Sequence, residues 1–306
     1  MRFGSTGHVE FAPAKINLTL RVGQRRPDGY HALESLVAFA HLGDELRLVP
    51  GGELALSLTG ETASHAGPRN DNLVLKAARA LLAEIADPQA GHFHLTKQLP
   101  VAAGLGGGSS DAAAALRLIA RINDLPAQDP RVMAAARTTG ADVPVCLDRE
   151  SRIMRGIGEI LSTPLRLPTL HAVLANPGVP VPTAAVFGAL ARSRDGNMPP
   201  AIDDDPATRL LEAGREPAAG ALIDALASSA NDLERPAIAL FPAVGETLDA
   251  LRASRRCGLA RMSGSGGTCF GLFGSAEDTK EAAARLAREH PDWWVRETIL
   301  GAAPVQ

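Results

Sequence analysis

A run of glycines that separates a strand-like segment from a helix-like one constrains this chain most. The segment His92–Leu99 alternates apolar and polar residues with the period of a β-strand, and Ala112–Ile122 is rich in alanine, which favours a helix. The glycines between them are Gly104, Gly106, Gly107 and Gly108. Because glycine adopts positive φ and lets other groups approach the backbone, the sequence predicts a tight loop at the start of a helix.

This loop has the chemistry of a phosphate-binding site. Ser109, Ser110 and Asp111 are residue types that begin helices, where free N–H groups and the positive end of the helix dipole attract anions. The loop has no GxxxxGK[ST] pattern, and Ser109 stands where a GxGxxG dinucleotide motif needs glycine. We therefore predict phosphate binding of another type. A flexible linker or a plain strand–helix turn is the alternative.

A second glycine-rich segment, Met262–Cys269, lies between two strand-like segments. Alone it is equally well explained by a hairpin turn. Together, the two loops predict two walls of backbone around one polyphosphate. Neither loop contains lysine, and Lys97 could supply a positive charge nearby, although a lone strand lysine is usually solvated.

The length of 306 residues suggests two domains, which we expect at 1–160 and 161–306. In the first domain, hydrophobic periodicity predicts a strand over Val9–Val22 and helices over Asp71–Ala86 and Pro130–Thr139. Asp71 is the expected cap of the first of these helices.

The second half has a regular order of elements. Prolines between 176 and 220 predict loops and short helices there. The other expected elements are a strand at Leu170–Ala175, a helix at Val244–Arg255, strands flanking the second glycine segment, a helix from its cap Ser275 to Glu289, and a strand at Trp293–Ile299. This order resembles a split β-α-β-β-α-β unit.

The composition excludes several classes of protein. A net charge of −3 provides no positive field for a nucleic acid, and no apolar run reaches the roughly 18 residues of a membrane helix. The first residues lack an apolar signal core, and the three cysteines form no CxxC pair. We therefore expect a reduced, cytoplasmic protein with no nucleic-acid or membrane partner.

Two polar residues, Lys15 and Asp142, are candidates for catalysis. Lys15 and Asn17 share one side of their strand, and Asp142 follows Gly140, where a helix stops. A carboxylate that accepts a hydroxyl proton and an ammonium that stabilises the alkoxide suit phosphoryl transfer. An exposed strand face and a turn residue are the plain alternatives, and the sequence leaves open whether Lys15 and Asp142 meet.

Two ring-bearing residues follow the turn at Pro27, Asp28 and Gly29: Tyr30, the only tyrosine, and His31. On a loop they could stack on a planar ring and bond to it, or simply pack their own turn. Phe187 alone reads as an ordinary core or surface residue.

A histidine pair also stands out. His92 and His94 share a strand face, but no third ligand is apparent, so we expect no metal site.

Three stretches together resemble the GHMP kinase superfamily, which includes galactokinase and the homoserine, mevalonate and phosphomevalonate kinases. They are Pro13–Leu18 with Arg26–His31, Leu99–Ala112, and Met262–Phe270. Within the superfamily, Arg26–His31 and Gly140–Pro144 look like the branch whose substrate is a cytidine-diphosphate ester of methylerythritol. The similarity covers most of the chain and is weakest from about 190 to 225.

The resemblance implies an α+β / α/β two-domain GHMP kinase fold. Its N-terminal domain would be ribosomal-protein-S5-like and its C-terminal domain ferredoxin-like, with the active site in the cleft between them. The implied reaction is ATP-dependent phosphorylation of the 2-hydroxyl of 4-diphosphocytidyl-2-C-methyl-D-erythritol, giving the 2-phosphate and ADP in non-mevalonate isoprenoid biosynthesis. Mg2+ is expected with ATP, without an identified protein ligand. The protein would be a monomer or a weak homodimer.

The resemblance also implies roles for individual residues. Asp142 matches the catalytic base and Lys15 its partner. The ATP-binding positions are Asn72, Lys97, Pro100, Val101, Ala102, Ala103, Gly104, Leu105, Gly106, Gly107, Gly108, Ser109 and Ser110. The substrate positions are Asn17, Tyr30, His31, Thr183 and Phe187, and the second glycine loop contributes Gly264, Ser265, Gly266 and Gly267. Asp111 stands where relatives often carry Asn, and we expect it to face outward as a helix cap.

Three other functions stay open. Another GHMP kinase, of the homoserine or mevalonate type, would keep the phosphate loop but have no use for Tyr30, His31 and Phe187. A non-catalytic nucleotide-binding protein would need neither Lys15 nor Asp142. In an interaction module the glycine loops would only be turns.

Overall fold

The computed structural model describes residues 7–27, 29–68, 71–126, 128–194, 205–214 and 216–301. The chain forms two compact units, and each unit is built from several separate stretches of the sequence. Unit 1 consists of Met1–Ala14, Gly43–Val101 and Gly106–Arg149, and unit 2 of Lys15–Leu42, Ala102–Leu105 and Glu150–Gln306. The expected boundary near residue 160 stays a prediction. Asp28 of the expected turn lies outside the described residues.

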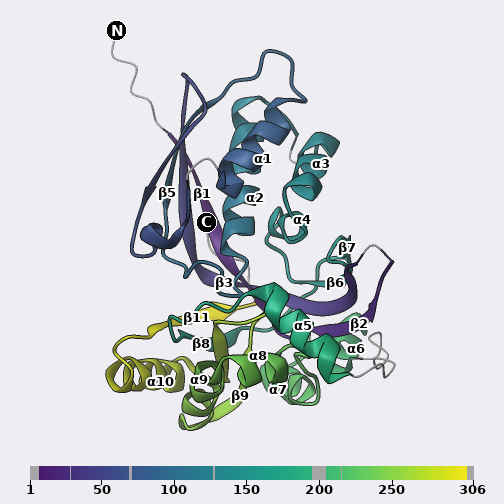
Figure 1. Cartoon of the computed structure of the whole chain (residues 1–306), viewed down its shortest axis with the longest axis vertical. Helices are drawn as coiled ribbons and strands as arrows, with labels where there is room; N and C mark the ends of the chain where they lie inside the picture. The colour runs from purple at the N-terminus through teal and green to yellow at the C-terminus, as the bar shows by residue number, and fades with distance from the viewer. Residues whose placement is uncertain are drawn as a thin grey trace. The chain divides into compact units, whose positions relative to one another are not determined.

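Unit 1 combines part of a sheet with a group of helices (Figure 1). Within it, β4 (Ala55–Thr59) pairs in parallel with β5 (Gly91–Thr96), and β5 pairs in antiparallel with the Glu45–Pro50 part of β3 (His31–Pro50). A 3-10 turn, η1, covers Ala63–His65. The helices are α1 (Leu73–Leu82), α2 (Gly107–Ile122), α3 (Pro130–Thr139) and α4 (Val143–Cys146).

The helix α3 is confirmed at its predicted bounds, whereas the starts of α1 and α2 differ from the prediction. Asn72, not Asp71, caps α1, because its side chain accepts a hydrogen bond from the Val74 N–H. Helix α2 begins at Gly107 rather than at Ala112. Its cap is Gly106 at φ +61°, a left-handed conformation that glycine adopts without a Cβ clash, so two glycines form the first helical turn.

The strand predicted over Val9–Val22 is two strands, β1 (His8–Asn17) and β2 (Arg21–Arg25). The break has a physical cause: two consecutive N–H groups share one carbonyl oxygen of β3, and the next N–H bonds outside this strand pairing. The N–H groups of Leu18 and Thr19 donate to Leu36 O, and the N–H of Leu20 donates to Ala230 O.

Unit 2 contains the predicted split β-α-β-β-α-β unit. Its strands are β8 (Leu170–Asn176), β9 (Cys257–Met262), β10 (Cys269–Phe273) and β11 (Trp294–Leu300). They lie in the order β11-β8-β10-β9 with antiparallel neighbours, and β11 also pairs with β3 at Ala40. In sequence terms this order is fourth, first, third, second, as in a ferredoxin-like sheet. The fold class is therefore confirmed for this unit.

Helices complete unit 2, together with β2 and β6 (Arg152–Gly156), which pair with β3, and β7 (Ile160–Leu161), which pairs with β6. The helices are α5 (Thr183–Ser193), α6 (Pro206–Glu212), α7 (Ala219–Ala227), α8 (Glu234–Leu240), α9 (Pro242–Arg252) and α10 (Ala276–Glu289). Figure 1 shows α8, α9 and α10 on one side of the β8–β11 sheet. Asp203 and Asp204, before α6, lie outside the described residues.

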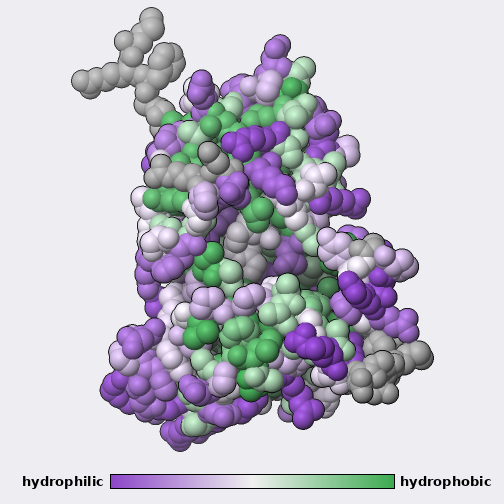
Figure 2. All heavy atoms as spheres, viewed as in Figure 1, coloured by the Kyte–Doolittle hydropathy of each residue, from purple (hydrophilic) through white to green (hydrophobic). Residues whose placement is uncertain are grey.

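Helix α10 shows how the sequence pattern produces this packing. Ser275 caps it by accepting from the Asp278 N–H, as predicted. Ala282 and Leu286 point into an aliphatic core with Val173, Leu248 and other residues of the sheet and of α9. The outer face of α10 forms the strongly hydrophilic lower left of Figure 2. Within the described ranges, no helix is both long and apolar enough to span a lipid bilayer.

Candidate functional site

In unit 2 the two glycine-rich segments touch directly. Ser263 Oγ donates to Gly104 O at 2.8 Å, and the Thr268 N–H donates to Ala103 O at 3.0 Å. Gly104 has φ +77°, and a Cβ there would lie 2.3 Å from Ser263 O. Glycine is therefore required at 104 because two backbones meet there. At these residues the two predicted walls are bonded to each other rather than separated.

The end of strand β1 joins the same contact. The Lys15 N–H donates to Leu105 O at 2.8 Å, and the Lys15 ammonium donates to Asn17 Oδ1 at 3.3 Å. Asn17 Nδ2 donates to Ser35 Oγ at 2.7 Å. Lys15 and Asn17 are both buried, so the alternative of an exposed strand face is wrong. These bonds fix the amide of Asn17, with its oxygen toward the lysine.

Ser263 links these pieces, and the sequence interpretation did not single it out. Its hydroxyl accepts from the Asn17 N–H at 3.1 Å and donates to Gly104 O, and the side chain is fully buried. The buried Asn231 holds the second loop from its other side, donating through Nδ2 to Met262 O and Gly264 O, both at 2.8 Å. The only sequence signal for Ser263 was its position beside the glycines.

The predicted ring-binding residues lie at the start of α5 and the start of β3, both in unit 2. The rings of His31 and Phe187 are 5.6 Å apart between centroids and tilted by 33°. Thr183, one helical turn before Phe187, bonds through its hydroxyl to Ser265 Oγ at 2.7 Å. Helix α5 thus connects the ring residues to the second glycine loop. Tyr30, beside His31, is 61% exposed.

In unit 1 a buried ion cluster lies next to the start of α2. Lys97 Nζ bonds to Asp44 and, at 2.8 Å, to Asp111 Oδ2. Asp44 Oδ1 also accepts from the N–H groups of Gln98 and Leu99. A Cβ on Gly107 would lie 3.5 Å from Lys97 Nζ. All three charged side chains are buried, so the expectation of an outward Asp111 and the plain alternative of a solvated Lys97 are wrong: a buried ammonium needs carboxyl partners.

One lysine serves two carboxyl groups in this cluster. Burial raises the pKa of Asp111 to about 8, with the negative charge of Asp44 acting in the same direction and Lys97 against it. Burial acts to lower the pKa of Lys97, but Asp111 and Asp44 hold it above its usual value. Within the described ranges, Asp111 Oδ1 has no hydrogen-bond partner. Lys97 therefore stays charged, and the carboxyl group of Asp111 readily takes up a proton.

The first turn of α2 offers the backbone donors that a phosphate needs. The Ser110 N–H is the first to bond within the helix, to Gly106 O. The N–H groups before it have no intrahelical partner, and the dipole adds positive potential. Gly108 lies near Leu73, the residue after the α1 cap Asn72, since a Cβ on Gly108 would be 3.5 Å from Leu73 Cδ1. Two of the predicted ATP residues, Asn72 and Lys97, thus lie near the start of α2.

Asp142 occupies the cap position of α4 and makes no capping hydrogen bond with its side chain. It belongs to unit 1, whereas Lys15 belongs to unit 2, and their pairing stays a prediction. The described part of the chain holds no group of three His, Cys, Asp or Glu side chains able to coordinate a metal. The His92 and His94 rings stack on each other at 4.3 Å.

Comparisons with known proteins agree with the motifs. Residues 72–149 match the model of the GHMP kinases N terminal domain, and residues 207–295 match the model of the GHMP kinases C terminal. The 4-diphosphocytidyl-2-C-methyl-D-erythritol kinase of Methylobacterium radiotolerans is 55% identical over 290 residues, covering 94% of this chain and 97% of that protein.

Solved structures give the same result. A crystal structure of a 4-(cytidine 5'-diphospho)-2C-methyl-D-erythritol kinase superposes with a TM-score of 0.76 at 35% identity, covering 97% of this chain and all of that one. The homoserine kinase from Cytophaga hutchinsonii reaches a TM-score of 0.70 over 98% of this chain and 97% of its own, but at 19% identity it is similar in fold alone.

The close approach at Gly104 predicts a large effect of Gly104→Ala. The added Cβ would clash with Ser263 O in addition to straining a positive φ, so we expect a loss of about 2–4 kcal/mol in the free energy of unfolding. Gly178→Ala is the control, because Gly178 also has a positive φ, +75°, but an added Cβ would meet no other atom within 4 Å; it should lose about 1 kcal/mol. Urea unfolding measures both, and equal losses would contradict the clash.

The raised pKa of Asp111 predicts a pH-dependent effect of Asp111→Asn. The folded protein holds a proton on Asp111 that the unfolded chain releases at a pH near 4, so this contribution to stability is lost as pH rises from about 4 through about 8. Asparagine does not titrate and can still accept from Lys97. From pH 5 to 8, we expect the melting temperature of the variant to rise relative to that of the parent. Above pH 8 the difference between the two should become constant. A constant difference across this range would show that Asp111 is ionised throughout.

Proposed function

This chain belongs to the GHMP kinases and, within them, to the 4-diphosphocytidyl-2-C-methyl-D-erythritol kinase family, and from that membership we propose its reaction. It transfers the γ-phosphoryl group of ATP to the 2-hydroxyl of 4-diphosphocytidyl-2-C-methyl-D-erythritol, giving the 2-phosphate and ADP in non-mevalonate isoprenoid biosynthesis. The observation that carries the proposal is the 55% identity to a kinase of this name over nearly the whole length of both chains.

The chemistry assigns different tasks to Asp142 and Lys15. As the 2-hydroxyl oxygen bonds to the γ-phosphorus, the bond from that phosphorus to the β-phosphate oxygen breaks and ADP leaves. The Asp142 carboxylate takes the hydroxyl proton, and the Lys15 ammonium stabilises the negative oxygen. The bond from Lys15 to Asn17 Oδ1 supports this proposal, because it holds the ammonium in one orientation.

Backbone groups of the Pro100–Ser110 loop bind the ATP phosphates in this proposal. The free N–H groups at the start of α2 do so without a lysine in the loop. Asn72 binds nearby: its Oδ1 is taken by the α1 cap, which leaves its Nδ2 group for the nucleotide. Lys97 supports the loop and does not offer a free charge to the phosphates, because its ammonium is paired with Asp44 and Asp111.

The cytosine ring of the substrate binds beside His31 and Phe187, with Tyr30 as the second aromatic face. A pyrimidine ring stacks well on such side chains. His31 Nδ1 lies 3.3 Å from Gly23 O; with the proton on Nδ1, its other nitrogen can accept a hydrogen bond from the cytosine amino group. Thr183 is fixed by Ser265 and lies on the same helix face as Phe187.

Magnesium enters this proposal only with the nucleotide. Mg2+ would neutralise charge on the transferred phosphates, as it commonly does in kinases. The described residues form no protein cage for a metal ion, so we derive no step through a protein-bound one. We further propose a cytoplasmic protein that is a monomer or a weak homodimer.

The role of Asp142 predicts a loss of turnover in Asp142→Asn. Removing a general base lowers kcat by about 10²–10⁴-fold, while ATP binding should change little. Asp129→Asn, at the cap of α3, is the matched control and should keep its kcat. Phosphorus NMR of the product and calorimetry of ATP binding provide the two measurements. A kcat within threefold of the parent would exclude Asp142 as the base.

The exposed Tyr30 provides a clean test of the ring site. Tyr30→Ala should raise the KM for the cytidyl substrate by about tenfold, because one stacked face is lost. The melting temperature should stay constant, since the ring is 61% exposed. Ile160→Ala, which removes a side chain 56% exposed in the same unit, should change neither value. An unchanged KM for Tyr30→Ala would exclude stacking on this residue.

A further inference from the structure

Unit 2 has a pocket that none of the predicted site residues lines. Its volume is about 580 Å³, within the usual range for small-molecule sites. It lies among the end of α5, the segment between α7 and α8, helices α8 and α9, and strand β9. Its charged lining consists of Arg194, Asp232, Glu234, Arg235, Arg252 and Arg261.

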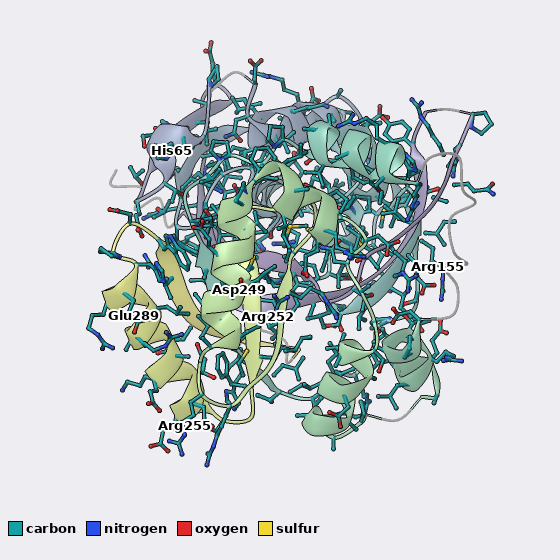
Figure 3. All side chains as sticks on the ribbon, turned by 60° about the horizontal axis from the view of Figure 1, so that its bottom comes forward. His65, Arg155, Asp249, Arg252, Arg255 and Glu289 are labelled. Carbon is teal, nitrogen blue, oxygen red and sulfur yellow. The ribbon has the colours of Figure 1, made fainter. Side chains whose placement is uncertain are left out.

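Two of these arginines are already neutralised. Arg194 bonds to Asp232 at 3.1 Å, and Arg21, outside the pocket, reaches the same carboxylate at 3.3 Å. Arg252 lies 3.6 Å from Glu234 and 3.1 Å from Asp249, and Figure 3 labels Arg252 and Asp249 on α9. Both carboxylates of the pocket therefore have cationic partners. The remaining charge of the lining is positive.

Arg261 is a buried cation without a carboxylate partner. Only 6% of the residue is exposed. Its guanidinium donates to three carbonyl oxygens, those of Leu18, Leu226 and Ser229, and it makes no ion pair within the described part of the chain. Burial lowers the pKa of Arg261, with Glu234 and Asp205 opposing this from beyond ion-pair distance. Buried charges are normally compensated, so this one favours an anion in the adjacent space.

Arg235 adds a second uncompensated charge. It is exposed at the pocket, on α8, and makes no hydrogen bond or ion pair with any residue that the structure describes. Its five N–H donors are therefore available to a ligand. An arginine fork of this kind matches the oxygens of a phosphate group.

The edge of β9 supplies a backbone donor as well. On this edge, Met262 is occupied by side chains: its N–H donates to Glu234 and its carbonyl accepts from Asn231. The Met262–Cys269 pair is thus not a hydrogen-bonded pair of the ladder. Two residues earlier, Ala260 repeats that orientation, so its N–H and C=O face away from β10, on the side where the pocket lies.

We propose that this pocket binds a small molecule carrying a phosphate or diphosphate group, held by Arg235, the Ala260 N–H and the field of Arg261. The site is separate from the proposed kinase site in the residues that line it. Its volume exceeds that of a phosphate ion, which leaves space for an organic part. The inference does not depend on the proposed kinase reaction, because it rests on the pocket alone.

Calorimetry with inorganic diphosphate tests the site. The whole 306-residue chain is titrated in magnesium-free buffer with saturating ADP, which occupies the nucleotide site. We expect one diphosphate to bind, and Arg235→Glu to weaken binding by at least about tenfold, the loss expected when a charge-assisted bond is replaced by repulsion. Arg288→Glu is the matched control: Arg288 is exposed on α10 and outside the pocket lining, so binding should stay the same.

Three outcomes would overturn the proposal. They are no binding to the parent protein at millimolar diphosphate, equal binding to Arg235→Glu and the parent, and an equal loss in both arginine variants, which would indicate charge screening rather than a site. Both variants change exposed residues, so folding is not at risk, and thermal melting verifies this. A kinase assay on the same samples tests the proposed reaction separately, so the two proposals can fail independently.

Discussion

The arrangement of unit 2 depends on the hydroxyl of Ser263. A hydroxyl has one proton, and this one goes to Gly104 O, so the oxygen is left to accept from the Asn17 N–H. The direction of both bonds is therefore fixed. Three segments that are distant in the sequence meet at one atom, and the absence of a Cβ at 104 lets them come that close. The conformations of the first glycine loop, the second loop and the Lys15–Asn17 strand end are consequently coupled.

In unit 1, where the first glycine loop continues into α2, buried ion pairs rather than close backbone contacts determine the local structure. Lys97 lies next to the first turn of α2, but it is bonded to Asp44 and Asp111, so its charge is balanced inside the protein. A phosphate at this helix start would meet backbone N–H groups rather than a free ammonium. This agrees with a net charge of −3 and with the lack of lysine in either glycine loop. Burial, together with the negative charge of Asp44, raises the pKa of Asp111 to about 8, although Lys97 acts against this.

Local sequence patterns predicted most of the helices and strands, whereas long-range hydrogen bonds determine where the buried polar side chains lie. The alternation of the strands, the cap Ser275 and the order of the split β-α-β-β-α-β unit were readable because each depends on neighbouring residues. The inward Asp111 was not, since its position depends on Lys97, whose other partner Asp44 lies 53 residues earlier. Ser263 contacts a residue 246 positions away. The start of α2 was missed because glycine is a poor helix former, yet here the left-handed Gly106 sets the entry and glycine can occupy the first turn.

The scarcity of aromatic residues makes the position of Tyr30 informative. The large buried rings of the core are phenylalanines such as Phe39, Phe93 and Phe270, packed among aliphatic side chains. The one tyrosine is instead 61% exposed, so it contributes little to the burial that stabilises the fold. Its exposed ring directly precedes His31, whose own ring contacts Phe187, so a ligand that reaches this contact can also reach Tyr30. A planar base would cover it, and the family to which the chain belongs acts on a substrate that carries one.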